Sequence, residues 1–323
     1  MKNQILLSLF SLLFLWGCSE INETTSLKLA HSLDVTHPVH LGMEYMAERV
    51  AEKSNGQLKI EIYPSQQLGT ERQCLELLQI GSLAITKVSA AVMENFAPNI
   101  QVFSLPYVFR DRAHIYKTLD GEIGKDLLVQ SEKYWLRGLT YFDAGQRSFY
   151  SKEPIESPDD LKDKKIRVQE SVTAMNLVRS LGGAPTPISW GELYTALQQG
   201  VVDGAENNPP SFYTSRHYEV CKYYTLNEHT AVPDILVIGT VAWNSLTKQE
   251  QEWLQEAADE AKVYQRKLWR EAEEEALAAV KEAGVKIITP DKSQFAEKTK
   301  SMFEEYKSQP EKYDIIQQIQ AVK

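Results

Sequence analysis

The chain has 323 residues, of which 43% are hydrophobic and 24% charged, and its formal net charge at pH 7 is −9. This composition is that of a globular protein, and the length is sufficient for two hydrophobic cores. The negative charge argues against a polyanion such as nucleic acid as the partner. It does not exclude a small anionic ligand, because arginines in a water-poor cleft act over a Debye length of roughly 8 Å.

The N-terminal segment has the pattern of a secretory signal. Residues 1–17 contain an apolar run, Ile5–Leu15, which is too short for a membrane-spanning helix of about 20 residues. The box Leu15-Trp16-Gly17-Cys18 resembles the cleavage site of bacterial lipoproteins. We therefore expect export to the periplasm, a lipid anchor on Cys18 and a tether over residues 18–26.

The chain after the tether alternates between strand and helix patterns, as in α/β proteins. The first series comprises strands at 27–31, 58–63 and 83–88 and helices at 40–52 and 70–80. A second series begins after Asp143, and a strand at 235–240 is expected to return to the first sheet. We predict two lobes around a hinged cleft, with lobe I at 27–144 plus 234–272 and lobe II at 145–233 plus 273–323.

A strand at the start of the second lobe carries an arginine. Ile166 and Val168 alternate with Arg167 and Gln169, so Arg167 is expected to point away from the apolar face. Taken alone, an arginine on a strand is more often a surface or salt-bridged residue than a ligand contact.

The following segment adds an aromatic ring and amides. Ser189 and Glu192 have the spacing of a capping box, which predicts a helix from Trp190 to Gly200. A short strand at 201–204 is then expected to open into a polar turn, Glu206-Asn207-Asn208.

A long helix is predicted near the C-terminus. Thr247 and Glu250 form a second capping box, and no Pro or Gly follows before Gly284. At 1.5 Å per residue this helix is about 55 Å long, which exceeds one lobe. Its apolar positions do not keep a heptad, so a coiled coil is not expected.

Two further cysteines leave one question open. Cys74 and Cys221 lie far apart in helix-like segments. An exported protein can pair such cysteines, but a free cysteine is commonly a small buried apolar residue. The pattern favours two free thiols.

Motifs for catalysis or metal binding are missing from the sequence. It contains no G-x-S-x-G, H-E-x-x-H, P-loop or G-x-G-x-x-G pattern. Asp203 and Glu206 are the best pair of carboxylates for a sugar-cleaving enzyme, but their turn favours a structural role. His37 and His40 lack a third ligand for zinc. We expect no enzyme, no cofactor and no metal.

Several segments form a pattern that extends over nearly the whole mature chain. The segments are KIRV (165–168), PTP (185–187), ELYTALQQGVVDGAEN (192–207), SNGQLKIEIYPSQQLG (54–69), QVFSLPYVFRD (101–111) and YEVCKYYTLNEH (218–229). Together they resemble one protein family, the solute-binding subunits of tripartite ATP-independent periplasmic (TRAP) transporters.

The resemblance implies roles for residues of lobe II. Arg167 maps to the arginine that binds the substrate carboxylate through both guanidinium nitrogens, and a planar fork suits that task. Arg147 maps to a second family arginine. Asn207 matches the family asparagine, although the extra residue in ENNPP lets Asn207 and Asn208 exchange roles. Trp190 either faces the ligand or packs in the core.

Lobe I is expected to recognise hydroxyl groups. His37 and Glu71 at two helix starts are candidate partners for sugar hydroxyls, and Lys87 and Ser89 at a strand end are candidates for a second polar or acidic group. The alternatives are that Glu71 only favours the helix dipole and that His37 only caps its helix.

The family resemblance also implies the function. The chain is most similar to members that bind sugar acids, above all hexuronates such as glucuronate and galacturonate, and it would deliver its ligand to membrane permease subunits. The long helix would lie across both lobes. The open alternatives are a C4-dicarboxylate, a sialic acid or an aldonate as ligand, a sensor role and, less favoured, a sugar-cleaving enzyme.

Overall fold

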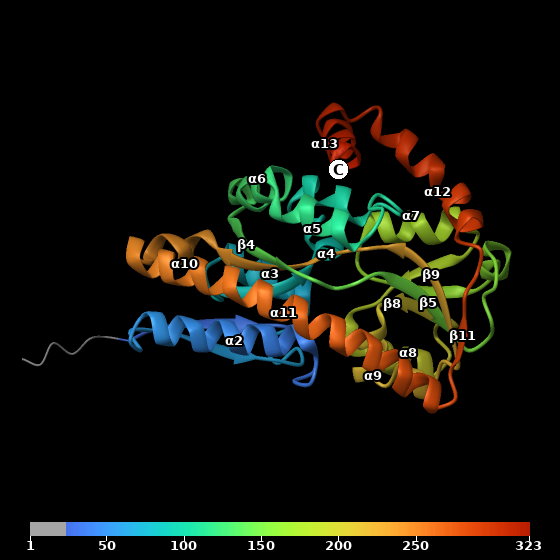
Figure 1. The fold of residues 1–323 in the computed structure, drawn as a ribbon, viewed down its shortest axis with the longest axis horizontal. Helices are drawn as coiled ribbons and strands as arrows, with labels where there is room; N and C mark the ends of the chain where they lie inside the picture. Colours follow the sequence, from blue (N-terminus) through green and yellow to red (C-terminus); the bar gives the residue numbers. More distant parts are fainter. Residues whose placement is uncertain (1–23) are drawn as a thin grey trace, which may run out of the picture.

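The computed structural model describes residues 24–323 and divides them into two α/β lobes, each built on one sheet (Figure 1). The sheet of lobe I has the order β2-β1-β3-β10-β4, in which β10 is antiparallel to both of its neighbours. Successive residues of β10 enter opposite apolar clusters, Ile235 one and Leu236 the other, so helices cover both faces. The strands are β1 (Thr25–Ala30), β2 (Leu58–Tyr63), β3 (Ile85–Ser89), β4 (Leu136–Phe142) and β10 (Asp234–Gly239).

The sheet of lobe II has the order β11-β9-β5-β8-β6-β7. It too is covered on both faces, because Phe149 and Tyr150 of β5 enter different apolar clusters. β6 lies parallel to β7 and β8, and β5 lies antiparallel to β8 and β9. The strands are β5 (Arg147–Ser151), β6 (Lys165–Val168), β7 (Ala184–Pro187), β8 (Gly204–Asn207), β9 (Tyr223–Thr230) and β11 (Lys286–Ile288).

Helices fill the connections of both lobes. Those of lobe I are α2 (Pro38–Lys53), α3 (Glu71–Gln79), α4 (Ala90–Met93), α5 (Arg112–Asp120), α6 (Glu122–Gln130) and α10 (Thr240–Ser245). Those of lobe II are α7 (Val172–Ser180), α8 (Leu193–Gln198) and α9 (Pro209–Thr214). Three more close the chain: α11 (Lys248–Glu282), α12 (Lys292–Tyr306) and α13 (Pro310–Ala321).

The predicted long helix is confirmed as α11, which has 35 residues and runs across both lobes (Figure 1). It packs against α2 of lobe I and α9 of lobe II. Its capping box forms as expected, because Glu250 N donates to Thr247 Oγ1 at 3.2 Å and Thr247 N donates to Glu250 Oε2 at 2.8 Å. Leu254 is buried in lobe I, and Val280 is buried in lobe II.

Two short segments also cross between the lobes, 143–146 between β4 and β5 and 231–233 between β9 and β10. In the first crossing Gly145 has a φ of +58°, and a Cβ there would lie 2.8 Å from Trp269 Nε1 of α11. A glycine is needed at this position for both reasons. The two-lobed α/β fold with several crossings is therefore as predicted.

The C-terminal helix differs from the predicted lobe assignment. The prediction placed residues 273–323 in lobe II, and α12 does pack there through Phe295 and Met302. However, α13 returns to lobe I, where Ile316 and Ile319 are buried (Figure 1). His114 of α5 lies 2.8 Å from the carbonyl oxygen of Ile319. The apolar positions of α13 define a buried face but do not specify which lobe receives it.

Three local predictions also differ from the structure. The first strand begins at Thr25, within the predicted tether. Residues 201–203 form a bend, and the strand comprises Gly204–Asn207 instead. At the predicted capping box, Ser189 Oγ donates to Glu192 Oε2 at 2.6 Å and caps no backbone N–H. A short 3₁₀ turn, Trp190–Glu192, therefore precedes α8.

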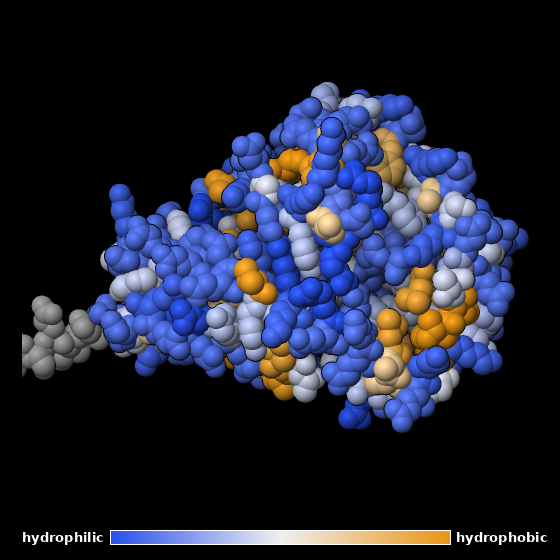
Figure 2. All heavy atoms as spheres, in the orientation of Figure 1, coloured by the Kyte–Doolittle hydropathy of each residue, from blue (hydrophilic) through white to orange (hydrophobic). Residues whose placement is uncertain are grey.

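The cysteines and the surface complete the fold. Cys74 and Cys221 are free and buried, one in the core of each lobe. The face seen in Figure 2 is mainly hydrophilic, with separate small hydrophobic areas. Over residues 24–323 no helix has the length and apolar character to cross a bilayer. The predicted signal, Cys18 and most of the tether lie outside these residues.

Candidate ligand-binding site

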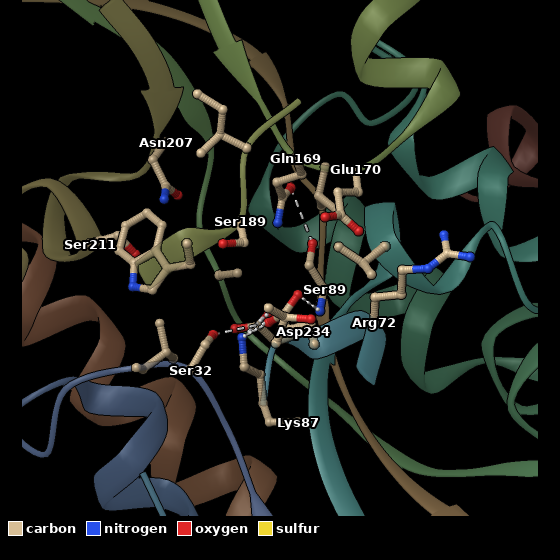
Figure 3. Close-up of a pocket in the computed structure, with 18 of the residues that line it drawn as sticks. Ser32, Arg72, Lys87, Ser89, Gln169, Glu170, Ser189, Asn207, Ser211 and Asp234 are labelled. Atoms are coloured by element: carbon tan, nitrogen blue, oxygen red, sulfur yellow. Dashed lines mark hydrogen bonds and ion pairs between the residues drawn. The ribbon is translucent and has the colours of Figure 1, made fainter. Parts of the chain in front are cut away.

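A cavity lies between the lobes and opens to solvent. Concave sites between two lobes are common places for small ligands to bind. Its lining comes from both lobes: the ends of β3 and β6, the starts of α3 and β10, and the turns around Trp190 and Asn208 (Figure 3). The predicted residues Glu71, Lys87, Ser89, Arg147, Arg167, Trp190, Asn207 and Asn208 all line it.

Arg167 supplies a buried cation with free donors. β6 anchors it, because Ile166 and Val168 on either side are buried in the core of lobe II. Its side chain is buried, with 2% of the residue exposed, and Nε donates to the carbonyl oxygen of Ile188 at 2.8 Å. Within residues 24–323, Nη1 is buried without a hydrogen-bond partner and no carboxylate pairs with the guanidinium. Burial lowers the pKa of Arg167, so an anion in the cavity would compensate a desolvated charge.

Trp190 lines the cavity and also packs against the core, so the two alternatives left open by the sequence are compatible. It lines the cavity, and its ring centroid lies 5.8 Å from Cζ of Arg167. It also packs against buried residues of both lobes and lies 5.1 Å from the ring of His217. The indole therefore forms an apolar wall beside the cation.

Arg147 is neutralised by a residue whose role the sequence did not reveal. Its Nε and Nη2 donate to the Glu206 carboxylate at 2.5 and 2.9 Å, and Nη1 donates to Asn207 Oδ1 at 2.9 Å. Both charged groups are buried. Burial alone would raise the pKa of Glu206, but Arg147 and His229 hold it at about 2. Most donors of Arg147 are therefore engaged inside the protein.

The two asparagines have different roles. Asn207 Oδ1 accepts from Arg147 and from the Asn208 backbone N–H at 2.9 Å, and Figure 3 shows its amide at the cavity edge. Asn208 caps α9, because its Oδ1 accepts from Ser211 N at 2.8 Å. Asn207 is therefore the one whose amide remains for a ligand.

The lobe I wall holds a lysine between two carboxylates. Lys87 Nζ lies 2.6 Å from Glu71 Oε1 and 3.2 Å from Asp234 Oδ1 (Figure 3). Glu71 Oε2 accepts from Ser89 N at 3.2 Å. Burial alone would lower the pKa of Lys87, but Asp234 and Glu71 raise it. This lysine is therefore charged, and its charge is shared between two acids.

His37 does not line the cavity. Its Nδ1 accepts from Val39 N at 3.2 Å and caps α2, which was the alternative considered for it. Its Nε2 therefore carries the proton and donates to Ser211 Oγ of lobe II at 3.1 Å. Burial lowers the pKa of His37 to about 3. A residue predicted to bind hydroxyls is thus a neutral bridge between the lobes.

Other side chains also join the lobes around the cavity. Ser89 Oγ lies 3.3 Å from Gln169 Oε1, and Asn95 Nδ2 lies 2.6 Å from the Glu170 carbonyl oxygen. Glu94 of lobe I accepts from the backbone N–H of Thr173, 3.0 Å away, at the start of α7. These bonds join the two lobes beside the cavity.

Sequence reasoning missed several lining residues. Asp234 directly precedes the apolar run of β10, a signal that was available. Gln66 Nε2 is buried and has no partner in residues 24–323, but nothing in its sequence context pointed to the cavity. The other polar lining residues that were missed are Ser32, Thr70, Arg72, Gln169, Glu170, Ser189 and Ser211.

The carboxylates weighed for an enzyme do not form a pair. Asp203 Oδ2 accepts from Lys165 N at 2.8 Å and does not line the cavity. Glu206 is held by Arg147. In the part of the chain that the structure describes, no three His, Cys, Asp or Glu side chains gather as a metal site.

Comparisons with known proteins identify the family of the chain. The profile of bacterial extracellular solute-binding protein family 7 matches residues 29–309. An uncharacterized protein of Salmonella typhimurium is 38% identical over 93% of this chain and 92% of its own length. A TRAP periplasmic solute-binding protein of Xanthobacter autotrophicus, solved with β-D-galacturonate, matches with a TM-score of 0.90 and 35% identity over 92% of this chain and 100% of that one.

A second solved structure is equally similar. A TRAP periplasmic solute-binding protein of Pseudomonas putida with bound D-glucuronate has a TM-score of 0.89 and 35% identity, and it covers 92% of this chain and 97% of its own. The predicted family is therefore confirmed. With its two lobes, its spanning helix and its interlobe cavity, the chain belongs to the solute-binding proteins of family 7, the substrate-binding subunits of TRAP transporters.

Proposed function

We propose that this protein captures a hexuronate, of the class of galacturonate and glucuronate, in the cavity between its lobes. The single observation that carries this proposal is the buried Arg167 guanidinium, which lines the cavity with an unpartnered Nη1. A carboxylate matches such a fork of donors, and pairing restores the interactions that burial removed.

The remaining lining suits a hydroxylated ring. Trp190 offers a flat apolar surface, and carbohydrate C–H groups pack on such a surface. Asn207 and Gln66 offer amide groups, while Glu71 and Asp234 offer acceptors for hydroxyl donors. An apolar acid would leave these buried polar groups unpaired, which costs free energy. The two solved relatives described above hold sugar acids of this class.

Capture would proceed by closure of the lobes. In the closed form the bonds from Ser89 to Gln169 and from His37 to Ser211 join the lobes around the ligand. A ligand stabilises this form only if it contacts both lobes, as it can by binding Arg167 of lobe II and the Glu71 and Asp234 carboxylates beside Lys87 of lobe I. The closed protein would then dock on the membrane subunits of its transporter and deliver the acid for import.

A ligand screen tests the proposal. We expect galacturonate or glucuronate to raise the melting temperature of the protein and to bind with 1:1 stoichiometry in calorimetry. Succinate, sialic acid and D-galactonate represent the alternative ligands. A clear shift with one of these and none with either uronate would contradict the proposal. Oligogalacturonides incubated with the protein should remain uncleaved, and turnover would support the sugar-cleaving alternative.

We also propose that Cys18 anchors the protein to a membrane in the periplasm, on the strength of the Leu15–Cys18 box. The full chain expressed in bacteria is expected to fractionate with membranes and to incorporate labelled palmitate. Cys18→Ser should abolish the label, whereas Cys74→Ser, which changes a buried cysteine, should not. A wild-type chain found only in the periplasmic extract, without label, would contradict the anchor.

A further inference from the structure

The charges that line the cavity are arranged unequally on its two walls. On the lobe II wall, Arg147 is neutralised by Glu206, and Arg167 is the one buried cation without a carboxylate partner among residues 24–323. On the lobe I wall, the single buried cation is Lys87, and it is shared between Glu71 and Asp234. The first wall therefore has an unmatched positive charge and the second an unmatched negative charge.

No other cation offsets the lobe I wall. Arg72 also borders the cavity, but Figure 3 shows its side chain extending away from the other lining residues. Its Nε donates to Glu76 at 3.2 Å, on the same exposed helix face. The remaining charged group on the border, Glu170, belongs to lobe II and is only half-buried, whereas Arg167 is buried.

The two walls border the same small cavity, because Arg167 lines it from lobe II and Glu71 and Asp234 line it from lobe I. Burial is the largest influence on the pKa of Arg167 and lowers it, while the Glu71 charge on the opposite wall acts to raise it. A ligand that reaches from Arg167 to the lobe I wall therefore places its other end beside Glu71 and Asp234.

We propose that the Glu71–Lys87–Asp234 cluster makes the site selective for acids with one carboxylate and rejects dicarboxylates of the same length. This proposal rests on the proposed capture of a sugar acid and defines its charge. A hydroxyl at the far end donates to either carboxylate. A second carboxylate there meets two like charges, while the lysine already has its counter-ions, and such juxtaposition weakens binding in a desolvated site.

The matched ligands for the test are D-galacturonate and galactarate, which carry one and two carboxylates on the same carbon chain. Calorimetry at pH 7 on the intact protein is expected to give a Kd for galactarate at least about 100-fold higher than that for galacturonate, or no detectable binding. Galactarate differs from galacturonate both in its second carboxylate and in its open chain. D-galactonate has an open chain but only one carboxylate, so it separates the effect of the lost ring from the effect of the added charge.

Two variants each remove one negative charge from the lobe I wall. Asp234→Asn and Glu71→Gln are expected to lower the galactarate-to-galacturonate ratio of Kd values by about tenfold or more, since Lys87 then has one counter-ion. Glu76→Gln is the matched control, because it removes a carboxylate from the exposed face of α3, and its ratio should equal that of wild type. Melting temperatures establish that each variant is folded. If only one of the two charge variants folds, its ratio of Kd values is sufficient for the test.

The outcomes are distinct. If the Kd of galactarate for the wild-type protein is within about threefold of that of galacturonate, the inference is overturned. It is also overturned if neither variant lowers the galactarate-to-galacturonate ratio of Kd values, because shape rather than charge would then exclude the diacid. If glucuronate binds and galacturonate does not, glucarate replaces galactarate in the comparison. If neither uronate binds, the proposed function fails, and the ratio of the Kd values of galactarate and D-galactonate decides the inference instead. Failure of both uronates, D-galactonate and galactarate to bind overturns both.

Discussion

Replacement of Arg167 with alanine is expected to weaken binding of the sugar acid by about 3 kcal/mol or more, a loss of at least about 100-fold in affinity. Two charge-assisted hydrogen bonds to the carboxylate disappear, and each is worth about 1.5–3 kcal/mol. The side chain is already held by Ile188 and faces no competing carboxylate, so the wild-type protein needs little rearrangement to bind. Calorimetry with the acid identified in the screen measures the loss.

Lysine at the same position is expected to restore little of this affinity. Its ammonium group is a compact charge without a planar fork, and it cannot bond the Ile188 carbonyl and both carboxylate oxygens with the same geometry. Arg179→Ala is the matched control, because Arg179 is exposed on α7 of the same lobe. Wild-type affinity in either Arg167 variant would refute the assignment of the carboxylate site.

The Glu206→Gln variant is expected to lose about 3–5 kcal/mol in the free energy of unfolding. It leaves the buried guanidinium of Arg147 without its counter-ion, whereas the size and shape of the side chain hardly change. Urea unfolding followed by circular dichroism gives the value. Glu297→Gln removes one member of an exposed ion pair with Lys300 and should change stability by less than about 0.5 kcal/mol.

The pH dependence of this difference follows from the depressed pKa. In the folded protein the pKa of Glu206 is about 2, against an ordinary value of 4.5. The stabilisation that ionised Glu206 gives the folded protein is therefore complete at pH values above 4.5, the ordinary pKa, and is lost as the pH falls from there towards 2. The stability gap between wild type and Glu206→Gln should be constant near neutral pH and should narrow in acid. A gap that is small at pH 7, or that widens in acid, would contradict the buried ion pair.

The predictable parts of the fold are those that depend on residues close together in the sequence. Alternation of apolar residues identified β6 and its arginine, and the Thr247–Glu250 box identified the start of α11. Both depend on residues at most a few positions apart. The family motifs predicted that Arg167 and Asn207 contact one ligand, and both residues line the interlobe cavity.

The parts that were missed depend on contacts between distant residues. Lys87 and Asp234 are 147 positions apart, and only the pairing of β3 with β10 brings them together. The sequence did not reveal Glu206 as the partner of Arg147 for the same reason, because the pairing of β5 with β8 brings these two residues together.

Some local patterns were compatible with two structures. Ser189 and Glu192 satisfy each other through their side chains, although the spacing also fits a capping box. His37 has a ring nitrogen that suits a hydroxyl or a backbone N–H, and the cap prevails because the ring is fully enclosed. In such cases packing, rather than the pattern, decides the outcome.

The return of the C-terminal segment to lobe I adds a fourth passage of the backbone between the lobes. It lies in the last turns of α12, where Met302 is buried in lobe II and Tyr306 in lobe I. The other passages are 143–146, 231–233 and α11. Because the chain crosses at all four places, any opening of the cavity must bend or rotate the backbone at each of them, including the end of α12, which is far from the cavity in sequence.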